Sequence, residues 1–140
     1  MIAYRATADG ITVDQLTGGF FVGWPNPPSP ETHLRILQGS ACIVLAVDAD
    51  TDQVVGFITA ISDGVLAAFI PLLEVLPSYQ GQGIGSELVR LLLVQLRDHY
   101  SVDLLCDADV QPFYERLGMQ RAPGMLLRYR SNQSGIARSS

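Results

Sequence analysis

Hydrophobic residues along the chain form short runs typical of strands and one longer stretch with helical spacing. Apolar runs rich in β-branched residues cover 41–47, 54–61 and 65–76, and they predict three consecutive strands joined by turns. Shorter runs predict a strand over 1–7, another over 101–106 and a closing strand from Met125 to Tyr129. From 83 to 97 the apolar residues recur at helical spacing and leave few polar positions, which predicts a helix buried on a sheet.

Individual residues mark where these elements break or begin. Pro71 lies inside the run 65–76 and cannot donate to a sheet ladder, so it indicates a bulge, an edge or a place where neighbouring strands part. Ser29 followed by Pro30 is typical of a helix start, and Asp109 predicts the N-cap of another short helix that ends at Leu117. The order of elements predicts an α/β domain, a mixed sheet with helices on its faces.

Composition limits the classes of protein that this chain can belong to. Its 140 residues suit a single domain, which we assign to 1–130, with a flexible tail at 131–140. A net charge of −5 argues against nucleic acid and anionic lipid as partners, and no apolar run is long enough for a membrane span. The N-terminus lacks a secretory pattern, which favours the cytoplasm. Cys42 and Cys106 lie in or beside apolar runs, so neither a disulfide nor a metal site is expected.

An aromatic and proline-rich stretch at 20–30 fits neither a linker nor a regular element. We weigh two interpretations equally: a loop fixed to the core, or a wall of a substrate pocket that includes Phe21 and Trp24. His33 follows on the predicted helix after Pro30. No motif surrounds it, and we expect a partly exposed structural residue more readily than a catalytic one.

A glycine-rich turn carries the strongest chemical signal. Gly81, Gly83 and Gly85 stand at every second position between a predicted strand and the long helix. The first N–H groups of a helix lack intrahelical acceptors, and the helix dipole adds positive charge, so such a turn binds a diphosphate without lysine. Close packing is the alternative reason for such glycines. The G-x-G-x-G spacing does not fit the G-x-G-x-x-G of dinucleotide-binding folds, and the absence of lysine excludes a P-loop.

Two segments resemble the GNAT superfamily of N-acetyltransferases. The run from Leu73 to Leu88 is similar to the acetyl-CoA signature of that family, whose core is [Q/R]-x-x-G-x-[G/A]. The segment from Phe113 to Met119 is similar to the family's aromatic-tyrosine, leucine-glycine stretch. The resemblance spans about 54–119, and two motifs in the right order are more specific than one.

This resemblance implies a fold and a cofactor. The fold is a mixed, mostly antiparallel sheet of about six or seven strands, splayed at the middle, with helices on both faces. Acetyl-CoA enters the splay as co-substrate, and no metal is needed. The residues implied in its binding are Val75, Leu76, Gln80, Gly81, Gln82, Gly83, Ile84, Gly85, Ser86, Asp107 and Phe113. At Asp107 many members carry asparagine, so that contact departs from the family pattern.

The resemblance also implies transfer of the acetyl group to a primary amine by direct attack in a ternary complex. Tyr114 is then the acid that protonates the leaving thiolate, and a backbone N–H near Val75 serves the oxyanion. Glu74 is the one acid in an apolar strand, so it is either the general base or half of a structural pair. The acceptor, a small-molecule or peptide amine, is not readable from the sequence.

Other functions compete with catalysis. A non-catalytic acyl-CoA sensor or scaffold would lack a base, and retention of Tyr114 speaks mildly against it. A nucleotide-binding domain of another fold would prefer NAD or ATP, and the glycine spacing disfavours it. An apolar sheet edge near either terminus would support a homodimer.

Overall fold

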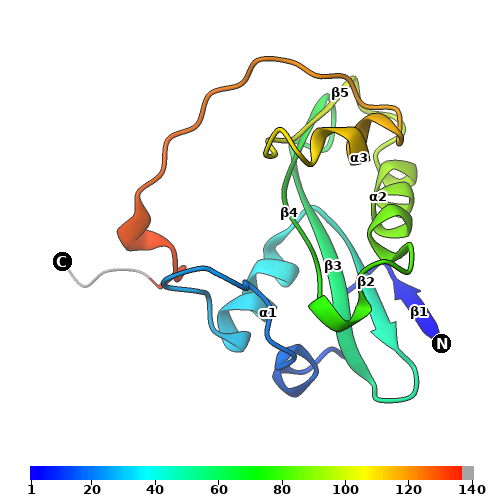
Figure 1. Cartoon of the computed structure of the whole chain (residues 1–140), viewed down its shortest axis with the longest axis vertical. Helices are drawn as coiled ribbons and strands as arrows, with labels where there is room; N and C mark the ends of the chain where they lie inside the picture. Colours follow the sequence, from blue (N-terminus) through cyan, green and yellow to red (C-terminus); the bar gives the residue numbers. More distant parts are fainter. Residues whose placement is uncertain (137–140) are drawn as a thin grey trace.

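The computed structural model describes residues 1–136 and contains one five-stranded sheet with helices on both faces (Figure 1). The strands lie in sequence order across the sheet, and they are β1 (Ile2–Arg5), β2 (Cys42–Asp48), β3 (Gln53–Ser62), β4 (Ala67–Val75) and β5 (Ser101–Asp103). The α-helices are α1 (Pro30–Gly39), α2 (Ile84–Gln95) and α3 (Gln111–Glu115). Short 3-10 turns cover Val13–Leu16, Pro77–Tyr79 and Arg130–Asn132.

The sheet is antiparallel from β1 to β4, and β5 is added in parallel. This arrangement confirms the mixed, mostly antiparallel fold expected from the sequence. The strand number in the described part, five, is below the six or seven expected. The missing strand is the predicted closing strand, whose residues lie outside any ladder.

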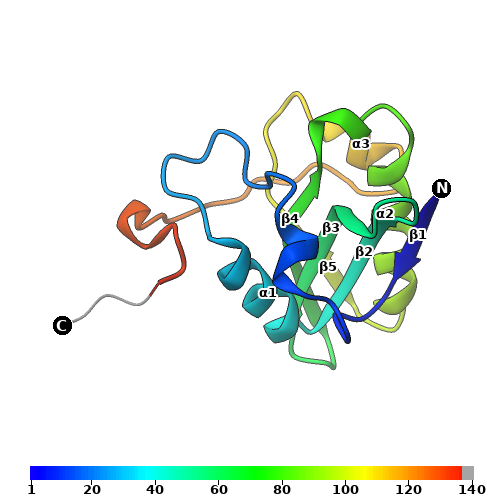
Figure 2. The same cartoon turned by 90° about the horizontal axis from the view of Figure 1, so that it is seen from below.

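Two hydrophobic cores form on the two faces of the sheet, because side chains of a strand alternate between its faces. One core packs α2 against the sheet through residues such as Leu88 and Leu92, both fully buried. The other packs α1 and the segment after β1 through Leu37 and Phe57. Figures 1 and 2 show α1 and α2 on opposite sides of the strands.

The irregularity expected at Pro71 is a bulge in β4. Thr59 pairs with Leu72 and Ile61 with Phe69, so two residues of β4, Ile70 and Pro71, face a single residue of β3. Ladder pairs between β4 and β5 end at Phe69 and Asp103. Past this point β4 continues to Val75 without β5 beside it, and the two strands splay. The predicted strand over 101–106 is therefore shorter than expected, because its second half has no ladder partner.

The starts of the helices confirm one sequence signal and correct another. The Ser29 hydroxyl accepts a hydrogen bond from the Thr32 N–H at 3.1 Å, with Pro30 in the first helical turn. Asp109 is not the N-cap of α3. Val110 holds that position, and backbone bonds of the preceding turn lead into the helix in place of a side-chain cap.

The chain after α3 leaves the sheet. The predicted closing strand from Met125 to Tyr129 is wrong for this structure, because every residue from 120 to 132 is exposed and none pairs with a strand. Figure 1 shows this segment as a long arc that leaves the side of β5 and ends beyond α1. We call residues 119–132 the C-terminal arm. Of the predicted tail at 131–140, residues 137–140 lie outside the described part.

Candidate acyl-CoA site

The glycine-rich turn connects the end of β4 to the start of α2. Gly81 has φ +78° and Gly83 has φ +82°, the left-handed region in which glycine has no steric penalty. Gly83 is the N-cap of α2 and no side chain caps the helix. Within residues 1–136, the N–H groups from Gly81 to Ser86 donate to no protein acceptor. The turn therefore presents a row of unpaired donors at the positive end of a helix dipole, which suits a diphosphate.

The backbone of Val75 faces the splay between β4 and β5. The next residue, Leu76, donates its N–H to Val55 O at 2.8 Å, and backbone groups of successive strand residues point to opposite sides. The N–H and C=O of Val75 are thus directed away from β3. Gln80 Nε2 donates to the Val75 carbonyl at 3.0 Å. Of the two backbone positions implied for the pantetheine arm, the N–H of Val75 is open toward the splay, whereas the carbonyl of Val75 accepts from Gln80 and the N–H of Leu76 is already paired.

Gly85, Val75 and Phe113 meet where α2, β4 and α3 come together. A Cβ placed on Gly85 would lie 3.6 Å from Phe113 Cζ and 3.8 Å from Val75 Cγ2. Because Gly85 has no side chain, space remains between its backbone, Phe113 and Val75. The structure thus brings together residues that are up to 38 positions apart in the sequence.

Tyr114 lies next to this junction on the short helix α3. Its ring packs edge-on against Phe113, with ring centroids 4.9 Å apart, and contacts the core on the α2 face. Burial, with a smaller contribution from nearby Cys106, raises the pKa of Tyr114 above its ordinary value of 10.0. The phenol therefore stays protonated at neutral pH, as a general acid requires.

Glu74 is held from the opposite face of the sheet. The Phe21 N–H donates to Glu74 Oε1 at 2.8 Å, which ties the aromatic loop to β4. Burial raises the pKa of Glu74 above its ordinary 4.5, and the hydrogen bond from Phe21 partly offsets this. Phe21 has φ +64°, an uncommon value for a bulky residue. The backbone thus accepts local strain while it directs an N–H to a half-buried carboxylate.

The predicted acid and base consequently lie on different faces of β4. Leu72 and Glu74 share the face of the α1 core, whereas Leu73 and Val75 pack on the α2 core together with Tyr114. Past Phe69, β4 has no ladder partner on its β5 side.

The aromatic residues of the loop divide between core and surface. Phe21 is 4% exposed, so its ring belongs to the core; Trp24 is half-buried, with its ring 4.9 Å from that of Phe21. His33 is 1% exposed and packs among Phe20, Phe21 and Phe57, which corrects the expected partial exposure. Burial lowers its pKa to about 4. Its role is structural in this arrangement.

The remaining predicted contacts are exposed or half-buried around the turn. Gln82 and Asp107 are exposed, Ser86 is half-buried, and Ile84 is buried under α2. One anchor of the turn was missed from the sequence: the Tyr79 hydroxyl donates to Asp48 Oδ2 at 2.6 Å and fixes the chain before the turn to the end of β2. No local signal links these two residues, since they meet only through the sheet register.

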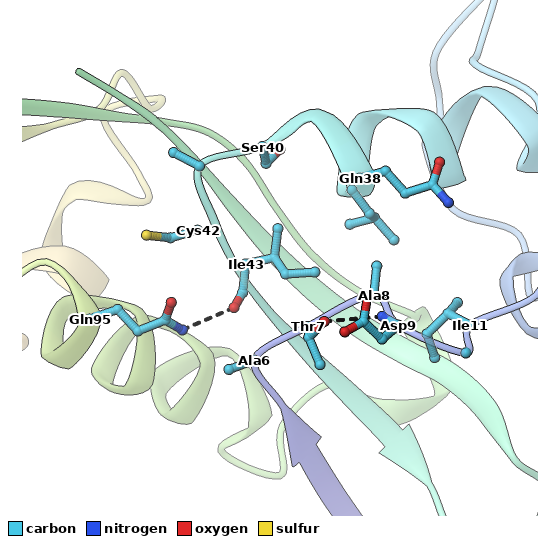
Figure 3. A pocket seen from close by; sticks show the side chains of 13 residues that line it. Ala6, Thr7, Ala8, Asp9, Ile11, Gln38, Ser40, Cys42, Ile43 and Gln95 are labelled. Carbon is cyan, nitrogen blue, oxygen red and sulfur yellow. Dashed lines mark hydrogen bonds between the residues drawn. The ribbon is translucent and has the colours of Figure 1, made fainter. Parts of the chain in front are cut away.

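A separate cleft of about 500 Å³ lies at the other end of the sheet (Figure 3). It is lined by residues 6–11, the end of α1, the start of β2 and Gln95, whose Nε2 donates to Ile43 O. The strand directions place it away from Val75, and it contains no predicted site residue. Among the described residues no cluster of His, Cys, Asp or Glu suits a metal ion, and no helix there is long and apolar enough to cross a membrane.

Comparisons with known proteins identify the family to which this chain belongs. The model of the acetyltransferase (GNAT) family matches residues 12–119. The crystal structure of a suggested acetyltransferase from Deinococcus radiodurans R1 is 55% identical, with a TM-score of 0.93 over 98% of this chain and 94% of that chain. The match therefore includes most of the C-terminal arm. A GNAT family protein from Streptococcus pneumoniae is 31% identical, with a TM-score of 0.70 over 93% of this chain and 99% of that one.

Relatives known by sequence carry related names. The uncharacterized N-acetyltransferase ycf52 of Pyropia yezoensis is 31% identical over 73% of this chain and 60% of its own length. The chloroplastic GCN5-related N-acetyltransferase 2 of Arabidopsis thaliana is 38% identical over 73% of this chain and 47% of its own length. The chain therefore spans less than two thirds of these relatives.

Proposed function

Because this chain belongs to the GNAT family of acetyltransferases, we propose that it transfers the acetyl group of acetyl-CoA to a primary amine. The observation that carries the proposal is the junction at the end of β4. There the glycine turn presents a row of unpaired N–H groups, and β4 runs on to Val75 without β5 beside it.

The residues of the turn and of β4 fit an acyl-CoA. The N–H groups from Gly81 to Ser86 would hold its pyrophosphate, and Val75 would pair with the pantetheine as an added strand does. Phe113 would bound the arm beside Gly85. When bound, acetyl-CoA supplies the activated thioester in a direct transfer through a ternary complex.

Tyr114 and Glu74 have complementary protonation states for this reaction. The raised pKa of Tyr114 keeps a proton available for the departing thiolate. Glu74, whose pKa is raised above its ordinary value by burial, would accept a proton from the incoming ammonium, directly or through water. The N–H of Val75 would donate to the carbonyl oxygen as negative charge develops on it.

The acceptor would approach on the Glu74 face, beside the aromatic loop. Trp24 is the half-buried aromatic residue there, and a net charge of −5 favours a cationic amine over an anionic partner. A small-molecule amine and a peptide amine both satisfy this chemistry. The cytoplasmic location stays a prediction.

Calorimetry with acetyl-CoA, CoA, NAD and ATP tests the binding part of the proposal. We expect micromolar binding of acetyl-CoA that is lost in Gly83→Asp, since a carboxylate would stand where the pyrophosphate is held. Gly64→Asp is the matched control, because Gly64 has a similar φ of +78° and open space around it but lies at the opposite end of β4. Absence of CoA binding in the wild type would refute the assignment.

Release of free thiol with a panel of amines tests the catalytic part. Turnover with some amine that falls in Tyr114→Phe, while acetyl-CoA affinity is kept, supports an acetyltransferase. Binding without release of thiol to any amine in the panel would favour the non-catalytic sensor.

A further inference from the structure

His33 lies where the aromatic loop, α1 and the sheet meet. Its ring centroid is 4.3 Å from that of Phe57 and 5.1 Å from those of Phe20 and Phe21. The contacts with Phe20 and Phe21 are edge-on, an arrangement that aromatic rings prefer. One imidazole ring thus joins two consecutive residues of the loop to β3.

Hydrogen bonding does not account for a histidine at this position. Among residues 1–136, the Nε2 atom of His33 is buried and has no hydrogen-bond partner. A buried nitrogen without a partner costs stability, and an apolar side chain would avoid that cost. Burial also lowers the pKa of His33 to about 4, so the ring is uncharged at neutral pH. What His33 contributes is therefore the packing of a small, flat ring.

Two of the residues that His33 contacts lie beside Glu74. Phe57 is the ladder partner of Glu74 in β3. Phe21 donates its N–H to Glu74 Oε1 at 2.8 Å. His33 therefore packs both on the strand neighbour of Glu74 and on the residue that donates to its carboxylate.

Phe21 depends on its surroundings to keep this hydrogen bond. Its φ of +64° lies in the left-handed region, which bulky residues rarely adopt unless neighbouring contacts hold them there. The ring of Phe21 is 4% exposed and packs on His33, on Phe57 and on Trp24, whose centroid is 4.9 Å away. Without these contacts the backbone would relax and turn the N–H of Phe21 away from Glu74.

We propose that His33 is a positioning residue for Glu74 and for the acceptor side of the site. It holds the ring of Phe21, so that the N–H of Phe21 stays on the carboxylate and the ring stays against Trp24. The inference rests on the proposed function, in which Glu74 is the base and Trp24 borders the acceptor. His33 contacts no reacting group in that scheme and acts through Phe21.

Nuclear magnetic resonance tests this link without any substrate. The amide proton of Phe21 should shift with pH as Glu74 titrates, and Glu74→Gln should remove the shift. His33→Leu should also remove it, because the N–H of Phe21 is no longer held on the carboxylate. Phe21→Leu breaks the same ring contact from the loop side and should give the same result.

Leu37→Val is the matched control. Leu37 is 2% exposed and lies one turn after His33 on α1, but it lines the separate cleft at the other end of the sheet. This variant disturbs the packing of α1 and should leave the titration of the Phe21 amide unchanged. The fluorescence of Trp24, the single tryptophan, should move to longer wavelength in folded His33→Leu and keep its wild-type position in the control.

Steady-state kinetics with an amine substrate adds the catalytic reading. Small displacements of reacting groups cost up to about 10²-fold in rate, so His33→Leu should lower kcat/KM by about 10-fold to 10²-fold. It should also change the midpoint of the acid limb of the pH profile and keep the affinity for acetyl-CoA. The double variant His33→Leu, Phe21→Leu should lose no more activity than either single variant, because both act through one contact.

The outcomes separate this proposal from the proposed function. A Phe21 amide that still titrates with Glu74 in His33→Leu, or one that stops titrating in Leu37→Val, would overturn the positioning role. If the amide behaves as expected but no amine in the panel is acetylated, the link between His33 and Glu74 holds and the proposed function fails.

Discussion

Two glycines at the junction of β3, β4 and α2 should respond in opposite directions to the same substitution. A Cβ on Gly56 would lie 3.2 Å from Leu88 Cδ1 and 3.3 Å from the backbone oxygen of Glu74. A Cβ on Gly85 would meet Phe113 and Val75 at 3.6 and 3.8 Å, which are ordinary contact distances. Gly56→Ala therefore presses on backbone, whereas Gly85→Ala fills available space.

These distances allow the change in the free energy of unfolding to be estimated for each substitution. Overpacking a close-packed site costs about 1–3 kcal/mol, and the Gly-to-Ala change returns about 0.5–1 kcal/mol by restricting the unfolded chain. Gly56→Ala should therefore destabilise the protein by up to about 2.5 kcal/mol. Gly85 lies in the first turn of α2 without a close neighbour, and its replacement should stabilise the protein by about 0.5–1 kcal/mol.

Urea unfolding followed by fluorescence measures both values, because Trp24 is the single tryptophan and packs on Phe21. Calorimetry with acetyl-CoA adds a functional reading. Gly56→Ala should weaken binding, since α2 must move from the sheet and carry the turn with it. Equal stability changes in the two variants would refute the view that Gly56 sets the distance between α2 and the sheet.

Three further predictions concern titratable residues of the two faces. Tyr114→Phe should lower the rate of thiol release by about 10²-fold or more with unchanged acetyl-CoA affinity, measured by steady-state kinetics and calorimetry; an unchanged rate would remove Tyr114 as the acid. In the wild type, activity should fall toward acid pH with a midpoint above the ordinary 4.5 of glutamate, and Glu74→Gln should abolish this limb of the pH profile. Burial lowers the pKa of His33 to about 4 from 6.5, so the unfolded chain binds a proton that the folded chain does not. Stability should therefore fall by about 1.4 kcal/mol per pH unit as the pH drops from 6.5 toward 4, and His33→Leu should flatten this slope in urea titrations.

Features set by local chemistry could be read from the sequence. Pro71 lacks an N–H, so an irregularity of the strand could be expected there, and the structure shows that it is a bulge. The Ser29–Pro30 cap and the glycine turn depend on a few neighbouring residues, and both form as expected. The predicted N-cap of α3 at Asp109 was wrong, because the carbonyls of Asp107 and Ala108 accept the N–H groups at the start of the helix and the Asp109 side chain is not needed.

Features set by distant partners could not be read in the same way. The alternating pattern at 125–129 predicted a strand, but a strand forms only where an edge is within reach, and these residues pair with no strand of the described chain. The buried state of His33 likewise depends on Phe57, which reaches it from the sheet.

Glu74 and Val75 are adjacent in the sequence, but their side chains lie on opposite faces of the sheet. Alternation along β4 sends the Glu74 side chain to the α1 core and the Val75 side chain to the α2 core. In a closed sheet this alternation would isolate the two faces. Because the bulge at Pro71 and the end of the β5 ladder open the sheet next to these residues, a thioester in the opening would have access to Glu74 from one face and Tyr114 from the other. In the proposed reaction, this irregularity would let Tyr114 protonate the leaving thiolate from one face while Glu74 accepts the proton of the amine from the other.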